Sequence, residues 1–188
     1  MNKTKLAVFP FLGILAFICS CAVNAEDPAL ERARRLLKQH PVIDGHNDLP
    51  WTIRAETEGS GDVEAYDLRA PTSGDTDIER LRAGGVGGQF WSVYVPPSET
   101  GAARLQLEQI DLARRMIARY PESLERATTA AEVARIMKEG RIASLLGIEG
   151  GHAIENSLGA LRAYSELGVR YMTLNHSCSH AWADSSTD

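Results

Sequence analysis

The sequence of 188 residues contains 20 Lys and Arg against 25 Asp and Glu, a formal net charge of −5 with His neutral. Without residues 1–25, which hold two lysines and no acidic residue, the count is 18 against 25, a charge of −7. This acidic balance disfavours nucleic-acid binding, and we expect no nucleic-acid partner. Cys178 is then the one remaining cysteine, which excludes an intramolecular disulfide framework and predicts a small buried apolar residue.

Residues 1–25 have the pattern of a secretory signal peptide, because two lysines precede an apolar run over 6–19 and small residues follow it. The apolar run is too short for a membrane-spanning helix. Two cleavage patterns are present: VNA at 23–25 fits an ordinary signal peptidase, whereas ICSC at 18–21 resembles a bacterial lipobox that would leave a lipidated Cys21. Both patterns predict a secreted or cell-envelope protein, with membrane contact only through a lipid anchor at Cys21.

Beyond this segment, apolar runs of strand length alternate with segments of helical period. The expected strands are 42–44, 88–95, 142–148 and 169–175, and the expected helices are 28–38, 76–82, 102–119, 129–140 and 157–167. Thr129 and Glu132 form a capping box, and Gly140 follows where a left-handed residue ends a helix. Strands separated by helices predict parallel pairing with right-handed crossovers.

Two architectures fit this α/β order, a doubly wound sheet and a (βα) barrel. Runs such as ASLLGI at 143–148 do not alternate with polar residues, as expected for strands that are covered on both faces or line a barrel. Local pattern does not choose between the two. The informative polar residues all follow strand ends, where barrel enzymes gather their catalytic groups, and this favours a barrel.

His46 and Asp48 come two residues apart at the end of the first expected strand. Side chains at i and i+2 of a strand point to the same side, so both can reach one point. An imidazole and a carboxylate suit Zn²⁺, and a catalytic zinc site typically has three protein ligands and a place for water. In the alternative interpretation Asp48 caps a turn before Pro50, and His46 makes only a local hydrogen bond.

Glu149 ends the third apolar run and is followed by Gly150 and Gly151. A carboxylate at the end of a buried strand is costly unless it is paired or coordinated, and two glycines allow a close approach. It can bridge two metal ions, or it can pair with an arginine across the barrel. His152 is equally compatible with a role behind the ligands or with packing.

His176 follows the fourth expected strand and is expected to face the barrel mouth. There an imidazole can stabilise the oxyanion that forms when a substrate carbonyl is attacked. The stretch HSCSH at 176–180 also allows a structural zinc site, although a fourth ligand is lacking. His180, Trp182 and Asp184 are expected to shape the wall of the pocket.

Four stretches carry a resemblance that covers the mature chain: PVIDGHNDLPW, GGVGGQFWSVYVP, LLGIEGGHAIENSLGALRAYSELGVRYMTLNHS and AWADSS. In this order they resemble the membrane (renal) dipeptidase family of zinc peptidases, family M19. The resemblance implies a (βα)8 TIM-type barrel, of which residues 26–188 supply about the first four βα units. It also implies hydrolysis of dipeptides, including those with a C-terminal D-residue.

Carried over to this sequence, the resemblance implies that His46 and Asp48 bind the first zinc and that Glu149 bridges two zinc ions. His176 matches the family histidine that contacts the substrate and polarises the scissile carbonyl. The implied nucleophile is a metal-bridging hydroxide. The remaining ligands of the second zinc would lie beyond residue 188.

The sequence departs from the family in two respects. In animal members a cysteine after FWSVY pairs with the one in HSC, but here Cys178 has no such partner, which favours a bacterial-type member. The chain also stops just after the fourth strand, so we expect a fragment that is poorly active by itself. Alternatives are another amidohydrolase-like metal hydrolase and a non-catalytic secreted binding module. The sequence is compatible with a homodimer.

Overall fold

The computed structural model describes residues 27–58, 60–97 and 100–187; the expected signal peptide and Cys21 lie outside this part. The strands are β1 Val42–Asn47, β2 Val86–Ser92, β3 Leu124–Arg126, β4 Ile142–Ile148 and β5 Val169–Met172. The helices are α1 Pro28–Gln39, α2 Leu49–Glu56, α3 Ile78–Ala83, α4 Ala102–Arg119, α5 Ala130–Lys138 and α6 Leu158–Glu166, with a 3₁₀ helix η1 at Gly151–Ile154.

All strands pair in parallel, as the alternation of strands and helices predicts. β1 pairs with β2, and β2 pairs with β4. The other edge of β4 is shared, because β3 lies beside residues 142–144 and β5 lies beside residues 146–148. The four expected strands are therefore confirmed in order and direction. They align their carboxyl ends at one edge of the sheet.

Three elements were missed from the sequence: β3, α2 and the short η1. β3 has only three residues, and its stretch LER shows no apolar run. α2 begins at Leu49, with one residue between it and the end of β1, and has Pro50 in its first turn. Proline is tolerated there because the first turn of a helix has no partner for its N–H groups.

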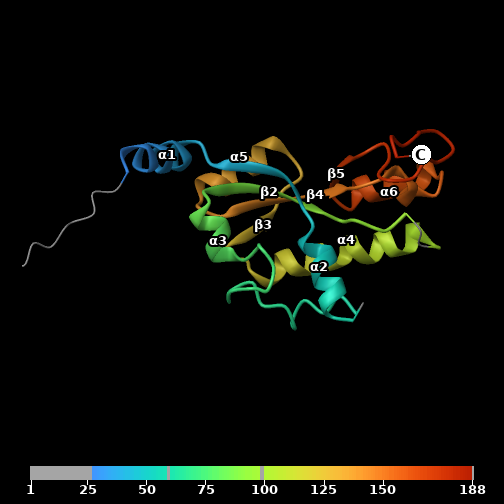
Figure 1. Ribbon diagram of the computed structural model, residues 1–188, viewed down its shortest axis with the longest axis horizontal. Helices are drawn as coiled ribbons and strands as arrows, with labels where there is room; N and C mark the ends of the chain where they lie inside the picture. The colour runs from blue at the N-terminus through green and yellow to red at the C-terminus, as the bar shows by residue number, and fades with distance from the viewer. Residues whose placement is uncertain (1–26, 59, 98–99, 188) are drawn as a thin grey trace, which may run out of the picture.

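The two faces of the sheet pack against different helices, as Figure 1 shows for α4 and α5. Ile142, Leu146 and Ile148 of β4 belong to the larger core, which also contains side chains of α2 and α4. Ala143 and Leu145 point to the opposite face and pack against α5. All seven residues of β4 are buried, which explains why its sequence does not alternate with polar residues.

β1 lies at an edge of the sheet, where it pairs only with β2 among the described strands. Its Ile43 is 53% exposed, although it is a large apolar side chain. Together with Phe90, Leu145 and residues of α5, Ile43 lines an apolar groove of about 550 Å³. The face of the sheet that packs against α5 is thus only partly covered near β1.

Helix ends follow the expected chemistry. Thr129 accepts a hydrogen bond from the Glu132 N–H at 3.2 Å, and the Glu132 carboxylate accepts one from the Thr129 N–H at 3.0 Å, which confirms the capping box of α5. The pKa of Glu132 is lowered, chiefly because its carboxylate also accepts hydrogen bonds from the N–H and hydroxyl of Thr128, and these donors favour the charged form. Gly140, beyond the end of α5, has φ +78°, as expected for a left-handed residue.

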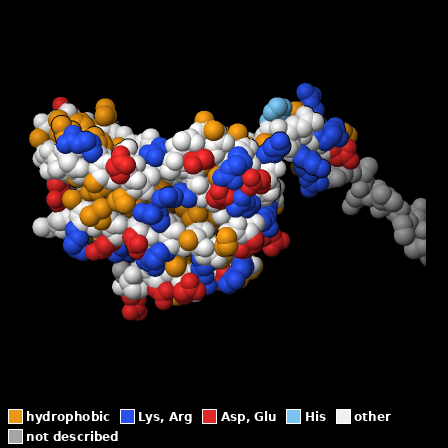
Figure 2. Space-filling view, turned by 180° about the vertical axis from the view of Figure 1, so that it is seen from behind, with side chains coloured by type: hydrophobic (Ala, Val, Ile, Leu, Met, Phe, Trp, Pro, Cys, Tyr) orange, Lys and Arg blue, Asp and Glu red, His pale blue; other side chains and the backbone are white. Residues whose placement is uncertain are grey.

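The surface mixes both signs of charge, and Figure 2 shows Lys and Arg side chains beside Asp and Glu across one face. Arg135, for example, contacts both Glu125 and Glu139. Cys178 is exposed, so the expectation of a buried residue was wrong. It lies in the loop after β5. Over the described ranges, no helix is long and apolar enough to cross a membrane.

Thr129→Ala removes the hydroxyl that accepts the Glu132 N–H and leaves that donor without its partner. We expect the free energy of unfolding to fall by about 1 kcal/mol, measured by chemical denaturation. Ser165→Ala within α6 is the matched control, because no hydrogen bond of its exposed hydroxyl is found in the described part of the chain. An equal loss in both variants would contradict a capping role for Thr129.

Candidate metal centre

The end of β1 places two side chains that could bind a metal ion side by side. His46 lies within β1, and Asp48 occupies the N-cap position of α2. The Asp48 side chain makes no capping bond; instead, Asn47 accepts the Leu49 N–H at 3.0 Å. The Asp48 carboxylate therefore turns to His46, with 3.1 Å between Oδ1 and Nε2. The alternative in which Asp48 serves as a turn cap does not hold.

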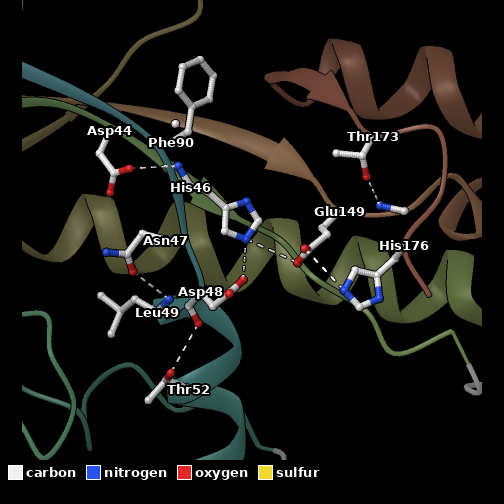
Figure 3. Close-up of polar contacts among 12 residues, drawn as sticks. Asp44, His46, Asn47, Asp48, Leu49, Thr52, Phe90, Glu149, Thr173 and His176 are labelled. Atoms are coloured by element: carbon white, nitrogen blue, oxygen red, sulfur yellow. Dashed lines mark hydrogen bonds and ion pairs between the residues drawn. The ribbon is translucent and has the colours of Figure 1, made fainter. Parts of the chain in front are cut away.

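Glu149 completes the cluster from the end of β4, as Figure 3 shows. Its Oε2 lies 3.4 Å from His46 Nε2, and its Oε1 lies 3.5 Å from His176 Nε2. The carboxylate thus presents one oxygen to each imidazole, and its side chain is 23% exposed. Within the described residues, its ionic contacts are with these two histidines rather than with the arginine of the alternative interpretation. Glu149 is the link between β1 and the loop that follows β5.

The glycines after Glu149 allow the loop after β5 to approach closely. Gly150, with φ +105°, donates its N–H to Thr173 Oγ1 at 2.7 Å. Gly151 donates to the Leu174 carbonyl at 3.2 Å. A Cβ on Gly151 would lie 2.3 Å from the Trp182 ring. These contacts hold the loop from which His176 reaches the cluster.

His176 lies four residues beyond the end of β5, and its side chain is 35% exposed. Its ring packs against Tyr94 with 5.3 Å between centroids, and Tyr94 in turn meets Trp51 edge-on at 5.4 Å. Burial, followed by the charges of Glu149 and Asp48, raises the pKa of Tyr94. Tyr94 and Trp51 were not expected at the site, although both belong to the stretches that carry the family resemblance.

Tyr171 was also missed. Its hydroxyl donates to the Gly45 carbonyl at 3.0 Å and lies 3.2 Å from His46 Nδ1. Burial, with the Glu149 and Asp48 charges, raises its pKa to about 12. The sequence signal that could have identified Tyr171 was its position in the fourth expected strand, β5, close to the strand end where the candidate ligands gather.

Other histidines of the sequence analysis lie outside the cluster. His152 Nε2 hydrogen-bonds the Val95 carbonyl at 2.9 Å, and burial lowers its pKa. His180 Nε2 bonds the Leu174 carbonyl at 2.8 Å, and its ring packs on Trp182. His176, Cys178 and His180 therefore do not gather around one point. The Asp184 carbonyl accepts a hydrogen bond from the Asn175 side chain, which closes the same loop.

The geometry of the cluster fits a divalent metal ion. Ligand atoms of His46, Asp48 and Glu149 all lie within 4.8 Å of one another. A tetrahedral zinc ion, with bonds of about 2.0–2.2 Å, separates its ligand atoms by roughly 3.3–3.6 Å. Two of the separations here are 3.1 and 3.4 Å. No other group of three such residues is found within 27–58, 60–97 and 100–187.

Imidazole and carboxylate ligands at the carboxyl ends of parallel strands define the class of metal-dependent hydrolases with a barrel-type α/β fold. A family model described as membrane dipeptidase (peptidase family M19) matches residues 30–188. The chain therefore belongs to the membrane dipeptidase family, which confirms the resemblance. The family consists of metallopeptidases, in agreement with the ligand cluster.

Dipeptidase 3 of Mus musculus is 47% identical over 164 residues, which cover 86% of this chain and 32% of that protein. The chain thus spans about a third of the length of the curated relatives it matches. The solved structure of dipeptidase AC, a metallopeptidase of family M19, has a TM-score of 0.60 and 28% identity, over 70% of this chain and 41% of that chain. The bacterial-type origin stays a prediction.

A metallopeptidase from Rhodobacter sphaeroides, solved with a phosphinate mimic of the dipeptide L-Ala-D-Ala, has a TM-score of 0.56 and 24% identity, over 70% of this chain and 44% of that chain. At this level of identity the similarity shows the fold. The parallel α/β fold expected from the sequence is thereby confirmed.

Gly151→Ala tests the close approach between η1 and the loop after β5. The added Cβ would lie 2.4 Å from the Leu174 carbonyl oxygen, which is backbone and yields little. We expect a loss of about 1–3 kcal/mol in the free energy of unfolding, measured by denaturation. Gly159→Ala in α6 is the control, because its nearest contact is 3.4 Å away and alanine favours a helix. A Gly151→Ala variant as stable as the control would contradict this packing.

Proposed function

We propose that the protein to which this chain belongs is a zinc-dependent dipeptidase that hydrolyses dipeptides, including those with a C-terminal D-residue. The observation that carries the proposal is the convergence of His46, Asp48 and Glu149 in a chain whose residues 30–188 match the M19 family. The dipeptide mimic named for the Rhodobacter sphaeroides relative supports this substrate class.

Three atoms would hold the first zinc: His46 Nε2, Asp48 Oδ1 and Glu149 Oε2. Glu149 Oε1 points away from this group, toward His176, and would be free to bind a second zinc. A second zinc would need further ligands besides the residues gathered here. When bound, the zinc pair supplies a nucleophile at neutral pH and a Lewis acid for the carbonyl.

His176 would bind the oxygen of the scissile carbonyl. Its Nδ1 lies 3.0 Å from Ser177 Oγ, whose hydroxyl can donate to it. In that tautomer Nε2 carries the proton, and its 3.5 Å separation from Glu149 is too long for a strong hydrogen bond. The Nε2 proton is then available to an oxyanion, while the Tyr94 ring supports the imidazole.

We further propose that residues 1–25 are a signal peptide, with lipidation at Cys21 as one route, and that residues 26–188 form part of the barrel. The protein would then act outside the cytoplasm, either secreted or in the cell envelope. The acidic composition without the signal peptide is compatible with a small-molecule substrate rather than a nucleic acid.

Glu149→Gln removes the charge shared by the two imidazoles and should abolish tight zinc binding. Changes behind metal ligands cost 10–100-fold in affinity, so we expect a loss of at least about 100-fold for this direct ligand. Chelator competition followed by metal analysis measures it. Glu166→Gln, at the end of α6, is the control and should retain zinc. Equal zinc content in both variants would remove Glu149 from the metal site.

His176→Ala should lower kcat for dipeptides by about 10²–10³-fold, because a donor to the developing oxyanion is lost. Zinc content should not change. The assay compares L,L and L,D dipeptides with N-acetyl and cyclic amide substrates, and His40→Ala is the control outside the site. Turnover of the acetyl or cyclic amides without dipeptide hydrolysis would instead indicate another metal hydrolase.

A further inference from the structure

β1 is irregular next to the candidate metal centre. Its register with β2 shifts between Asp44 and Asn47, where β1 places two residues opposite one residue of β2. This is the arrangement of a β-bulge, and His46 is one of the two residues. A bulge interrupts the ladder locally, so its backbone groups need other partners. Bulges beside functional sites also re-aim side chains, and His46 is the candidate ligand of this segment.

The Asp44 side chain supplies a partner at the bulge. His46 donates its backbone N–H to Asp44 Oδ1 at 3.2 Å. Figure 3 shows the Asp44 carboxylate at this N–H, while the imidazole of His46 points the other way, toward the other candidate ligands. The carboxylate therefore holds the backbone of His46 and leaves its ring free to reach the cluster.

Gln89 of β2 holds the second oxygen of the same carboxylate. Its Nε2 donates to Asp44 Oδ2 at 2.8 Å and to the Phe90 carbonyl at 3.2 Å. Both partners are acceptors, so the amide cannot turn over without placing its oxygen against another oxygen. Gln89 is completely buried, and its Oε1 has no hydrogen-bond partner among the described residues. Such an atom is unfavourable in a core, so the contact with Asp44 explains Gln89 better than packing does.

From these contacts we propose that Asp44 is a positioning residue, which is held by Gln89 and stabilises the bulge that directs His46 toward the metal position. The proposal rests on the metal site proposed above. Partners behind metal ligands typically change metal affinity by about 10–100-fold when they are lost. Aspartate suits this position because each of its oxygens meets a donor, whereas an asparagine would turn an N–H group toward one of these donors.

The test uses two variants of the complete protein to which this chain belongs. Asp44→Ala removes the acceptor of the His46 N–H. Gln89→Met keeps an unbranched side chain of similar size in the core, but it removes the amide that holds Asp44 and also the unpartnered Oε1. Asp62→Ala is the matched control, because Asp62 Oδ1 likewise accepts the N–H two residues on, from Glu64 at 2.9 Å, in the loop between α2 and α3.

Zinc affinity, measured by chelator competition, should fall by about 10–100-fold in Asp44→Ala and by about 10-fold in Gln89→Met, and it should not change in Asp62→Ala. With Co²⁺ in place of zinc, the visible absorption at saturation reports the ligand geometry. This absorption should change in Asp44→Ala and stay the same in Asp62→Ala. Metal-free Gln89→Met should unfold at the same denaturant concentration as the parent protein, because the amide that it loses has an unpartnered oxygen. A role in stability alone would give the opposite result for Gln89→Met, earlier unfolding with unchanged zinc affinity.

A measurement without metal separates this inference from the proposed function. In metal-free protein labelled with ¹⁵N-histidine, the backbone amide signal of His46 is assigned by its loss in His46→Gln. Hydrogen exchange of this amide should be roughly 10-fold faster in Asp44→Ala than in the parent protein, because a hydrogen bond to a charged group is lost. The exchange should not change in Asp62→Ala.

Unchanged exchange of the His46 amide in Asp44→Ala overturns the role of Asp44 at the bulge. Faster exchange with unchanged zinc affinity overturns the positioning of His46 as a ligand. If the parent protein binds neither zinc nor cobalt, the zinc-dependent function fails, whereas faster exchange in Asp44→Ala still supports the bond that holds the bulge. If Asp44→Ala does not fold, Gln89→Met decides by itself, and an unchanged zinc affinity in that variant contradicts the proposal.

Discussion

The structure depends on one constraint, the placement of the Glu149 carboxylate at the end of a strand whose seven residues are all buried. A charge next to such a strand is unfavourable unless oppositely polarised groups meet it. Here it lies between the imidazoles of His46 and His176, which arrive from β1 and from the loop after β5. Segments more than 100 residues apart in the chain are thus brought to one carboxylate. The parallel sheet makes this meeting possible, because its strands all end at the same edge.

Absent side chains are as important as the ligands. Gly151 lets the loop after β5 lie against η1, and Gly147 leaves the path by which Tyr171 reaches β1. A methyl group at either position would overlap with backbone or ring atoms. The sequence indicates which side chains could bind a metal ion. The distances between these side chains depend on the close packing at Gly147 and Gly151. The packing at these two glycines therefore determines the geometry of the candidate site.

Local signals in the sequence predicted much of the fold. α4 is an example, because its apolar period of about 3.6 residues marks both its existence and the face that carries Ile110, Ala113 and Ile117. The capping box at Thr129 similarly marks the start of α5 within one residue. β3 and α2 were missed because neither has a local signal of its own: β3 is stabilised by pairing with β4, and α2 by packing Leu49 and Ile53 into the core. The prediction that Cys178 is buried was wrong for the same reason, because its exposure depends on the path of a loop.

For the site, the sequence by itself determined which side chains are candidates for the chemistry, because residue type and position after a strand are local properties. It identified His46, Asp48, Glu149 and His176, together with the parallel α/β order that brings them to one edge. The tertiary structure alone decided that Asp48 turns to His46 instead of capping α2, that His152 and His180 bond backbone carbonyls, and that Tyr171 stands behind His46. These outcomes depend on distances of about 3 Å between segments far apart in the chain, and such distances follow from how the strands and loops pack.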